Sequence, residues 1–158
     1  MHPSAERVAA ALRALGVKAQ VIEFPHTTRT AQDAAAAIGT TVGQIVKSLV
    51  FLADGRPVLA LVSGMNRLDP EKLRRVAGAG RVERADADTV RTATGYAIGG
   101  VPPVGHAQAL AVFLDQDLLP HAVVYAAAGT PNAVFAIVPE QLRAVIGATV
   151  ADLAERKL

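Results

Sequence analysis

The chain has 158 residues, of which 51% are hydrophobic and 19% are charged, and its formal net charge is +2. This length and composition predict a single domain over residues 1–158 with a packed core, and they exclude a disordered chain. The absence of cysteine excludes disulfides, a thiolate nucleophile and zinc sites with thiolate ligands. The basic excess is too small to indicate a nucleic-acid partner by itself.

A cytoplasmic location is expected, because the sequence contains neither a recognisable targeting segment nor a membrane span. The first seven residues lack a basic stretch followed by an apolar one. No apolar run reaches the roughly 18 residues that would indicate a membrane span. The histidines show no metal-binding spacing of the HExxH type, so neither a metal nor another cofactor is expected.

The first forty residues predict two helices with a strand between them. Ser4 is placed to cap a helix that ends at Gly16. A strand is expected over residues 19–24, and Thr30 then caps a helix that ends at Gly39. The apolar positions that the first helix is expected to turn toward the core are Val8, Leu12 and Leu15.

The rest of the chain mixes strands and helices without strict alternation. Residues 46–52 and 58–62 predict a hairpin joined by Asp54-Gly55, and Asp69-Pro70 opens a helix. The elements expected next are a strand at 81–84, a helical turn after Asp86, a loop at 95–105, strands at 110–114, 123–126 and 134–138, and helices at 139–146 and 150–156. This order predicts an α+β fold with helices around a curved mixed sheet.

Lys47 is unusual because it lies in an apolar strand. It shares one face of the predicted strand with Leu49 and Phe51. Its ammonium group either leaves the sheet at the strand end or enters a partly enclosed pocket. A pocket would require an anionic or polar companion, because a buried charge without a partner is costly.

The segment from Thr94 to His106 is dense in glycine and proline. Glycines permit positive φ and let a ligand approach backbone N–H groups closely, and prolines stiffen the chain around them. Such a loop can bind a carbonyl oxygen or a water molecule with backbone groups alone. The alternative is an ordinary connection rich in turns.

No side-chain nucleophile is indicated. The sequence has no GxSxG elbow, no P-loop and no GxGxxG after a strand. Asp115 and Asp117 follow a strand end, where solvated carboxylates are common, so they are not expected to form an acid–base pair. His106 follows the glycine loop directly, although a lone loop histidine more often has a structural role. The basic residues between Arg67 and Arg91 are interpreted first as a solvated helix face.

Six short segments, taken in order, match a known family pattern. They are residues 30–35 (TAQDAA), 44–51 (QIVKSLVF), 62–64 (VSG), 94–96 (TGY), 99–106 (GGVPPVGH) and 128–132 (AGTPN). Together they resemble the YbaK/EbsC-type family of free-standing aminoacyl-tRNA deacylases, whose relatives include the editing insertion of bacterial prolyl-tRNA synthetases. The resemblance implies a mixed α/β domain with a barrel-like sheet and a pocket for the terminal adenosine and its amino acid.

The resemblance also implies roles for individual residues. Lys47 matches a required lysine that orients the 3′ end of the tRNA through its phosphate, and Gly99–Pro103 matches a GxxxP loop whose backbone holds the scissile carbonyl and the attacking water. Gly100 is the expected main backbone contact, so Lys47 and Gly100 are the expected catalytic residues. The expected substrate-binding residues are Thr30, Ser63, Gly99, Val101, Pro102, Pro103, His106, Gly129 and Asn132.

The implied activity is hydrolysis, in trans, of the ester bond of a mischarged tRNA by a water held by the backbone. The expected substrate is a tRNA for proline that carries a small wrong amino acid such as alanine or cysteine. The expected partners are the acceptor end of that tRNA and an aminoacyl-tRNA synthetase, with no membrane and no metal. Two alternatives stay open: a non-catalytic module that binds tRNA or a synthetase, and a hydrolase of small esters on the same fold.

Overall fold

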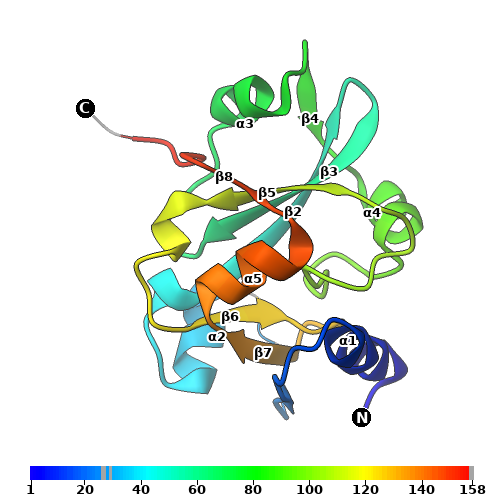
Figure 1. The fold of residues 1–158 in the computed structure, drawn as a ribbon, viewed down its shortest axis with the longest axis vertical. Coiled ribbons are helices and arrows are strands. Elements are labelled where there is room, and N and C mark those ends of the chain that lie inside the picture. Colours follow the sequence, from blue (N-terminus) through cyan, green and yellow to red (C-terminus); the bar gives the residue numbers. More distant parts are fainter. Residues whose placement is uncertain (26–27, 29, 157–158) are drawn as a thin grey trace.

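The structure is a computed structural model, and it describes residues 1–25, 28 and 30–156 (Figure 1). The helices in this part are α1 (Pro3–Ala14), α2 (Ala31–Ile38), α3 (Pro70–Ala77), α4 (Ala87–Thr94) and α5 (Pro139–Ile146), with 3₁₀ turns η1 (Val42–Gln44) and η2 (Gln116–Leu118). The strands are β1 (Val21–Glu23), β2 (Val46–Ala53), β3 (Arg56–Ser63), β4 (Val82–Arg84), β5 (Ala111–Asp115), β6 (Val124–Ala127), β7 (Ala133–Ile137) and β8 (Thr149–Ala151). None of these helices has both the length and the hydropathy of a membrane span.

The described strands form two sheets. The smaller sheet has the order β1-β7-β6 and is antiparallel, and the larger one has the order β4-β2-β3-β5-β8. The larger sheet is mixed, because β4, β2 and β3 pair antiparallel whereas β3, β5 and β8 pair parallel. The mixed α/β fold expected from the sequence is confirmed. The barrel-like closure is not confirmed, because these sheets stay open, and the strand pairing between their described residues is an isolated bridge from Ile45 to Tyr125.

The larger sheet is buried on both faces, because its strands are apolar at odd and even positions. On one face, Val50 of β2 and Leu59 of β3 join the core that lies toward the smaller sheet. On the other face, Phe51 and Val62 pack with Leu73 of α3 in a second core. Strands that are covered on both sides favour near-continuous apolar runs of this kind.

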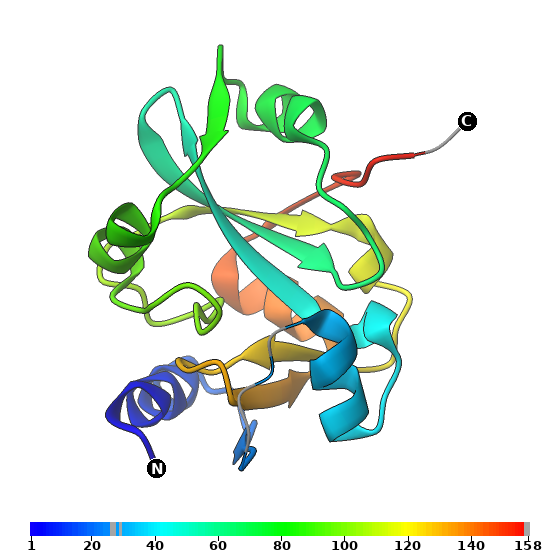
Figure 2. The ribbon, with the colours of Figure 1, turned by 180° about the vertical axis from the view of Figure 1, so that it is seen from behind.

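Helix α5 lies across the space between the two sheets, as the opposite views in Figures 1 and 2 show. Its Leu142 is fully buried in the same core as Leu59 and Phe135. Helix α5 begins with Pro139 and ends at Gly147, whose φ of 64° is left-handed, as the sequence predicts. The two sheets therefore share one core.

Three predicted details at the chain ends are wrong. Residues 150–156 are not a helix, because residues 149–151 form β8 beside β5 and Leu153 is then buried without helical hydrogen bonding. The N-cap of α1 is His2 rather than Ser4, since His2 Nδ1 accepts the hydrogen bond from Ser4 N and Pro3 takes the first helical position. Leu15 is 44% exposed, because it lies at the C-cap, where the chain leaves the helix.

Candidate functional site

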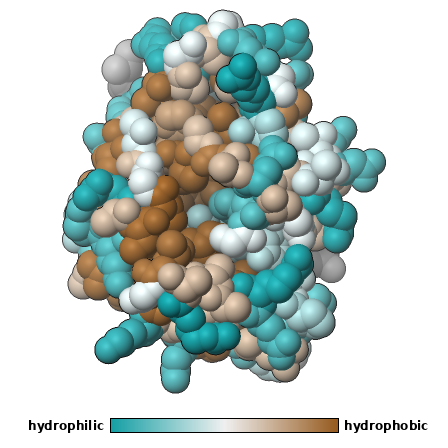
Figure 3. All heavy atoms as spheres, turned by 45° about the vertical axis from the view of Figure 1, so that its right-hand side comes forward, coloured by the Kyte–Doolittle hydropathy of each residue, from teal (hydrophilic) through white to brown (hydrophobic). Residues whose placement is uncertain are grey.

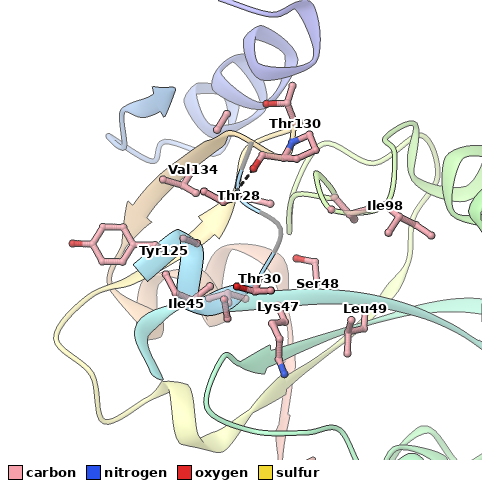
Figure 4. Close-up of a pocket in the computed structure, with 18 of the residues that line it drawn as sticks. Thr28, Thr30, Ile45, Lys47, Ser48, Leu49, Ile98, Tyr125, Thr130 and Val134 are labelled. Atoms are coloured by element: carbon pink, nitrogen blue, oxygen red, sulfur yellow. Dashed lines mark hydrogen bonds between the residues drawn. The ribbon is translucent and has the colours of Figure 1, made fainter. Parts of the chain in front are cut away.

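A pocket of about 270 Å³ opens beside the first half of β2 (Figure 4). Its walls come from β2, the N-terminal turn of α2, strands β6 and β7, and the loop after α4. Most of its lining side chains are apolar, and its polar lining residues are Thr28, Thr30, Lys47, Ser48, Arg84, Tyr125 and Thr130. Two of these are cations, and none of the described residues that line the pocket carries a carboxylate. The pocket therefore suits a ligand with both an anionic group and a small apolar group.

The pocket exists because β2 is longer than its neighbour β4. Strand β4 pairs only with residues 51–53, so the preceding half of β2 has an open edge on that side. Thr30 reaches this space as the N-cap of α2, where its hydroxyl accepts a hydrogen bond from Asp33 N. The capping pattern thus places a predicted site residue at the pocket wall.

Lys47 is one of the residues that line the pocket, and Figure 4 shows its ammonium group on the side of β2 opposite to Ser48. Lys47 Nζ donates a hydrogen bond to the backbone oxygen of Asn66. Burial lowers the pKa of Lys47 below its ordinary value, Asp115 opposes this shift, and the positive charges of Arg84 and Arg67 add to it. Of the two interpretations that the sequence left open, the structure shows a partly enclosed lysine with a polar companion.

A carboxylate cluster fixes the loop that holds Lys47. The Asn66 carboxamide nitrogen donates to Asp115 Oδ2 and to Asp117 Oδ2, both at 2.8 Å. Asp115 is fully buried and also accepts from Ser63 N at 3.0 Å. The two aspartates therefore act as hydrogen-bond acceptors for the loop after β3. The expectation of solvated carboxylates is wrong for Asp115, because its hydrogen bonds to Ser63 and Asn66 allow it to be fully buried.

The glycine loop contributes Gly99 and Val101 to the pocket wall, but not Gly100. Gly100 N donates to Ala97 O at 3.0 Å, and Gly100 O accepts from Gly129 N at 2.9 Å. Gly99 has a φ of 91°, so this turn requires glycine at that position. Because the Gly100 N–H is already used, it is not placed to bind a substrate in this structure. No hydrogen bond to another described residue uses the N–H of Gly99 or of Val101.

Gly100 instead lets two loops pack together. A Cβ atom at this position would lie 2.8 Å from Thr130 Cα and 2.9 Å from both Gly129 C and Gly129 O. Gly129 is equally constrained, since its φ is 98° and a Cβ there would lie 2.5 Å from Ser4 O. Glycine is therefore needed at both positions, because each packs directly against the backbone of another segment. Neither glycine lines the pocket.

The other predicted binding residues lie outside the pocket and support its walls. Ser63 Oγ donates to Gly43 O at 2.7 Å, and Asn132 Nδ2 donates to Phe24 O at 2.8 Å. Thr130 Oγ1 in turn donates to Asn132 Oδ1 at 2.9 Å, so Asn132 connects the pocket wall to the segment after β1. The remaining ones, Pro102, Pro103 and His106, follow the pocket-facing part of the glycine loop.

His106 stabilises the glycine loop from its far side. Its Nε2 lies 2.6 Å from Pro102 O, and since a carbonyl only accepts, Nε2 carries the proton. Burial lowers the pKa of His106, and the bond to Pro102 opposes this shift. The lowered pKa favours the neutral form of His106, and its bond to Pro102 O connects it to the glycine loop.

Stability is expected to decrease as the pH falls below about 6.5, because the unfolded chain then binds a proton at His106 more readily than the folded chain. His106→Gln should retain a hydrogen-bond donor to Pro102 O, and its unfolding free energy should depend less on pH in this range. The measurement is denaturant unfolding of both proteins at a series of pH values from about 5 to 8. Parallel profiles for the two proteins would contradict this role of His106.

Sequence reasoning missed Arg84 and Ser48 as pocket residues. Arg84 belongs to the basic stretch interpreted as a solvated helix face, but it lies on β4, with its guanidinium 6.0 Å from the ring centre of Phe51. Two other cations of that stretch, Arg74 and Arg75, pair with Glu71. The pairing of β4 with the end of β2 was the missing information.

A second hollow lies between α1, α5 and the loop after α4, and Figure 3 shows hydrophobic side chains gathered on this side of the molecule. Its lining includes Leu15, Val104, Leu110, Val112 and Ile146. No described residue that lines it is a lysine or an arginine. It therefore lacks the positive charge that distinguishes the pocket beside β2.

Comparison with known proteins identifies the family of the chain. The family model described as the aminoacyl-tRNA editing domain matches residues 26–145, which is most of the chain, so the chain belongs to this family. It is 33% identical to the uncharacterised protein YwhH of Bacillus subtilis, over 77% of this chain and 78% of that protein. It is also 38% identical to a proline–tRNA ligase of Nitratidesulfovibrio vulgaris over 56% of this chain, but it spans only 16% of the ligase.

Among solved structures, one described as a candidate trans-editing enzyme for prolyl-tRNA synthetase superposes with a TM-score of 0.95. The two chains are 51% identical, and the match covers 99% of each. The resemblance to the deacylase family read from the sequence is confirmed.

Proposed function

We propose that this chain is a trans-acting deacylase that hydrolyses the ester bond of a mischarged tRNA, with a tRNA for proline carrying alanine or cysteine as its preferred substrate. The observation that carries this proposal is the pocket beside β2, where two cations and no carboxylate among the described residues border a mainly apolar cavity. An aminoacylated 3′ end combines a phosphodiester with a small amino acid. The family membership of the chain supports this choice of ligand.

Lys47 is proposed to bind the phosphate of the tRNA 3′ end. In the structure its ammonium group contacts a neutral carbonyl, Asn66 O, so no carboxylate has to be displaced when a phosphate arrives. Arg84 lines the same pocket and adds positive charge. Charge-assisted contacts to phosphate are stronger than neutral hydrogen bonds, so binding here would fix the position of the ester.

The chemical step is proposed to need no side-chain nucleophile. A water oxygen attacks the ester carbonyl carbon, the bond from this carbon to the ribose oxygen breaks, and that oxygen leaves with a proton derived from the water. The N–H groups of Gly99 and Val101, in place of Gly100, are proposed to hold the carbonyl oxygen as negative charge develops on it. The neighbouring ribose hydroxyl is proposed to assist the proton transfer.

The size of the cavity favours a small amino acid. Discrimination between side chains that differ by one methylene is worth only about 1–3 kcal/mol, so more than one small amino acid is expected to be released. The test is hydrolysis of a panel of tRNAs charged with labelled alanine, cysteine, serine or threonine. Release of one or two of them would identify the substrate. Tight tRNA binding without release would favour the non-catalytic module, and release from simple aminoacyl esters without tRNA would favour the small-ester hydrolase.

A further inference from the structure

Ser48 has an unusual hydroxyl group at the pocket beside β2. Its Oγ atom is buried, and no described residue forms a hydrogen bond with it. Ser48 belongs to the pocket lining, and Figure 4 shows its side chain leaving β2 on the side opposite to Lys47, toward Ile98 and Thr130. A buried hydroxyl without a partner is costly to the folded state, so it calls for an explanation.

The backbone of Ser48 faces the same space. Ala85 N donates to Val50 O, which shows that the backbone groups of Val50 point toward β4. In an antiparallel pair, backbone groups alternate in direction from one residue to the next. Ser48 lies two residues before Val50, so its N–H and C=O also point away from β3, where β4 no longer covers the edge. Ser48 thus turns polar backbone groups toward the open edge of β2.

The opposite wall is the glycine loop. Ser48 shares a small adjoining cavity with Ile98 and Val101, so the hydroxyl lies close to the loop segment proposed to hold the ester carbonyl. The pocket lining supplies cations and, among the described residues, no carboxylate. This charge distribution favours a ligand atom that becomes negative, and such an atom requires hydrogen-bond donors.

We propose that the Ser48 hydroxyl donates a hydrogen bond to the carbonyl oxygen of the scissile ester and stabilises the negative charge that develops there. This inference rests on the proposed deacylase function. During the attack of water, the electron pair of the carbonyl bond moves onto its oxygen, which Ser48 and the loop N–H groups then hold. The pair returns when the bond to the ribose oxygen breaks. Ser48 forms no covalent bond and keeps its proton.

The expected result separates catalysis from stability. Ser48→Ala removes a hydroxyl that has no partner in the free protein, so its thermal midpoint should equal or exceed that of the wild type. Its kcat for deacylation should fall by about 10²- to 10³-fold with little change in KM, as for the loss of one oxyanion donor. Ser48→Thr keeps the hydroxyl on a residue suited to a strand, and should recover most of the activity.

A second serine provides the structural comparison. Ser63 Oγ is buried and donates to Gly43 O, so Ser63→Ala should lower the thermal midpoint, in contrast to Ser48→Ala. The experiment measures the thermal midpoint of all variants, and kcat and KM of wild type, Ser48→Ala and Ser48→Thr, on the mischarged tRNA that the wild type hydrolyses.

Three results would overturn the role of Ser48: wild-type kcat in Ser48→Ala, a loss of activity matched by a loss of stability, or a Ser48→Thr variant as inactive as Ser48→Ala. A wild type that releases no amino acid from any mischarged tRNA would instead overturn the deacylase function, and the inference with it. The two failures are therefore distinguishable, because only the first occurs with an active wild type.

Discussion

Lys47→Ala is expected to reduce the rate of deacylation at least about a hundred-fold while the protein stays folded, because misplacing a substrate by about 1 Å can have an effect of this size. The lysine ends a contact chain that runs from the buried Asp115 through Asn66 to the pocket. Removing the ammonium group leaves the partly exposed Asn66 without this donor, which should cost about 0.5–1.5 kcal/mol in unfolding free energy. Activity should therefore fall much more than stability.

The assay should compare Lys47→Ala with Lys47→Met, Lys47→Arg and a matched control. Lys47→Met keeps most of the apolar stem and should be as inactive as Lys47→Ala, whereas Lys47→Arg should retain part of the activity. Lys18 is exposed, so Lys18→Ala should behave as the wild type. Loss of one phosphate contact should also reduce the slope of log affinity against log salt by roughly 0.7–0.9. Full activity in Lys47→Ala, or an unchanged salt slope, would exclude phosphate binding by this lysine.

Gly100→Ala is expected to impair both stability and activity. The new methyl group would meet backbone atoms of Gly129 and Thr130 at 2.8–2.9 Å, so one of the two loops must move. Overpacking of this kind costs about 1–3 kcal/mol. Because the same loop presents Gly99 and Val101 to the pocket, its displacement should also lower kcat. Chemical unfolding and the deacylation assay measure the two effects.

Gly80→Ala is the matched control for Gly100→Ala. Gly80 also lies in a loop, but its φ is not left-handed, and a Cβ there would make only an ordinary contact of 3.5 Å with Asp54 Oδ1. Its unfolding free energy should therefore stay within about 0.5 kcal/mol of the wild type. Equal stability of the two variants would show that the contact between the loops tolerates a methyl group, and would remove the explanation given for Gly100.

The local elements could be predicted because short-range signals determine them. Thr30 and Asp33 define the start of α2, and Pro139 and Gly147 define the ends of α5. The final strand could not be predicted in this way. Residues 149–151 become β8 only because β5 offers a parallel edge, and that edge is made by a segment more than thirty residues earlier in the chain.

The sequence could predict which segments form the site, but not which atoms of those segments face the pocket. The resemblance located Lys47 and the glycine loop, and the structure brings Thr30, Lys47, Gly99 and Val101 into one pocket. The resemblance could not show which N–H group of the glycine loop lacks a hydrogen-bond partner within the protein, since this depends on the bond from Gly100 N to Ala97 O. Ser48 lies in one of the matching segments but is not singled out there, because its exposure to the pocket depends on β4 pairing only with residues 51–53 of β2.

The parallel strand pairs affect the order in which strands can join the larger sheet during folding. The β2–β3 hairpin has contacts close in sequence and can form early, whereas β5 and then β8 join through long chain separations that slow folding. Until β8 arrives, β5 presents an unpaired apolar edge to other chains. A nascent chain that stalls before residue 149 is therefore exposed to misassociation, even though every residue proposed to contact the ester has already been synthesised.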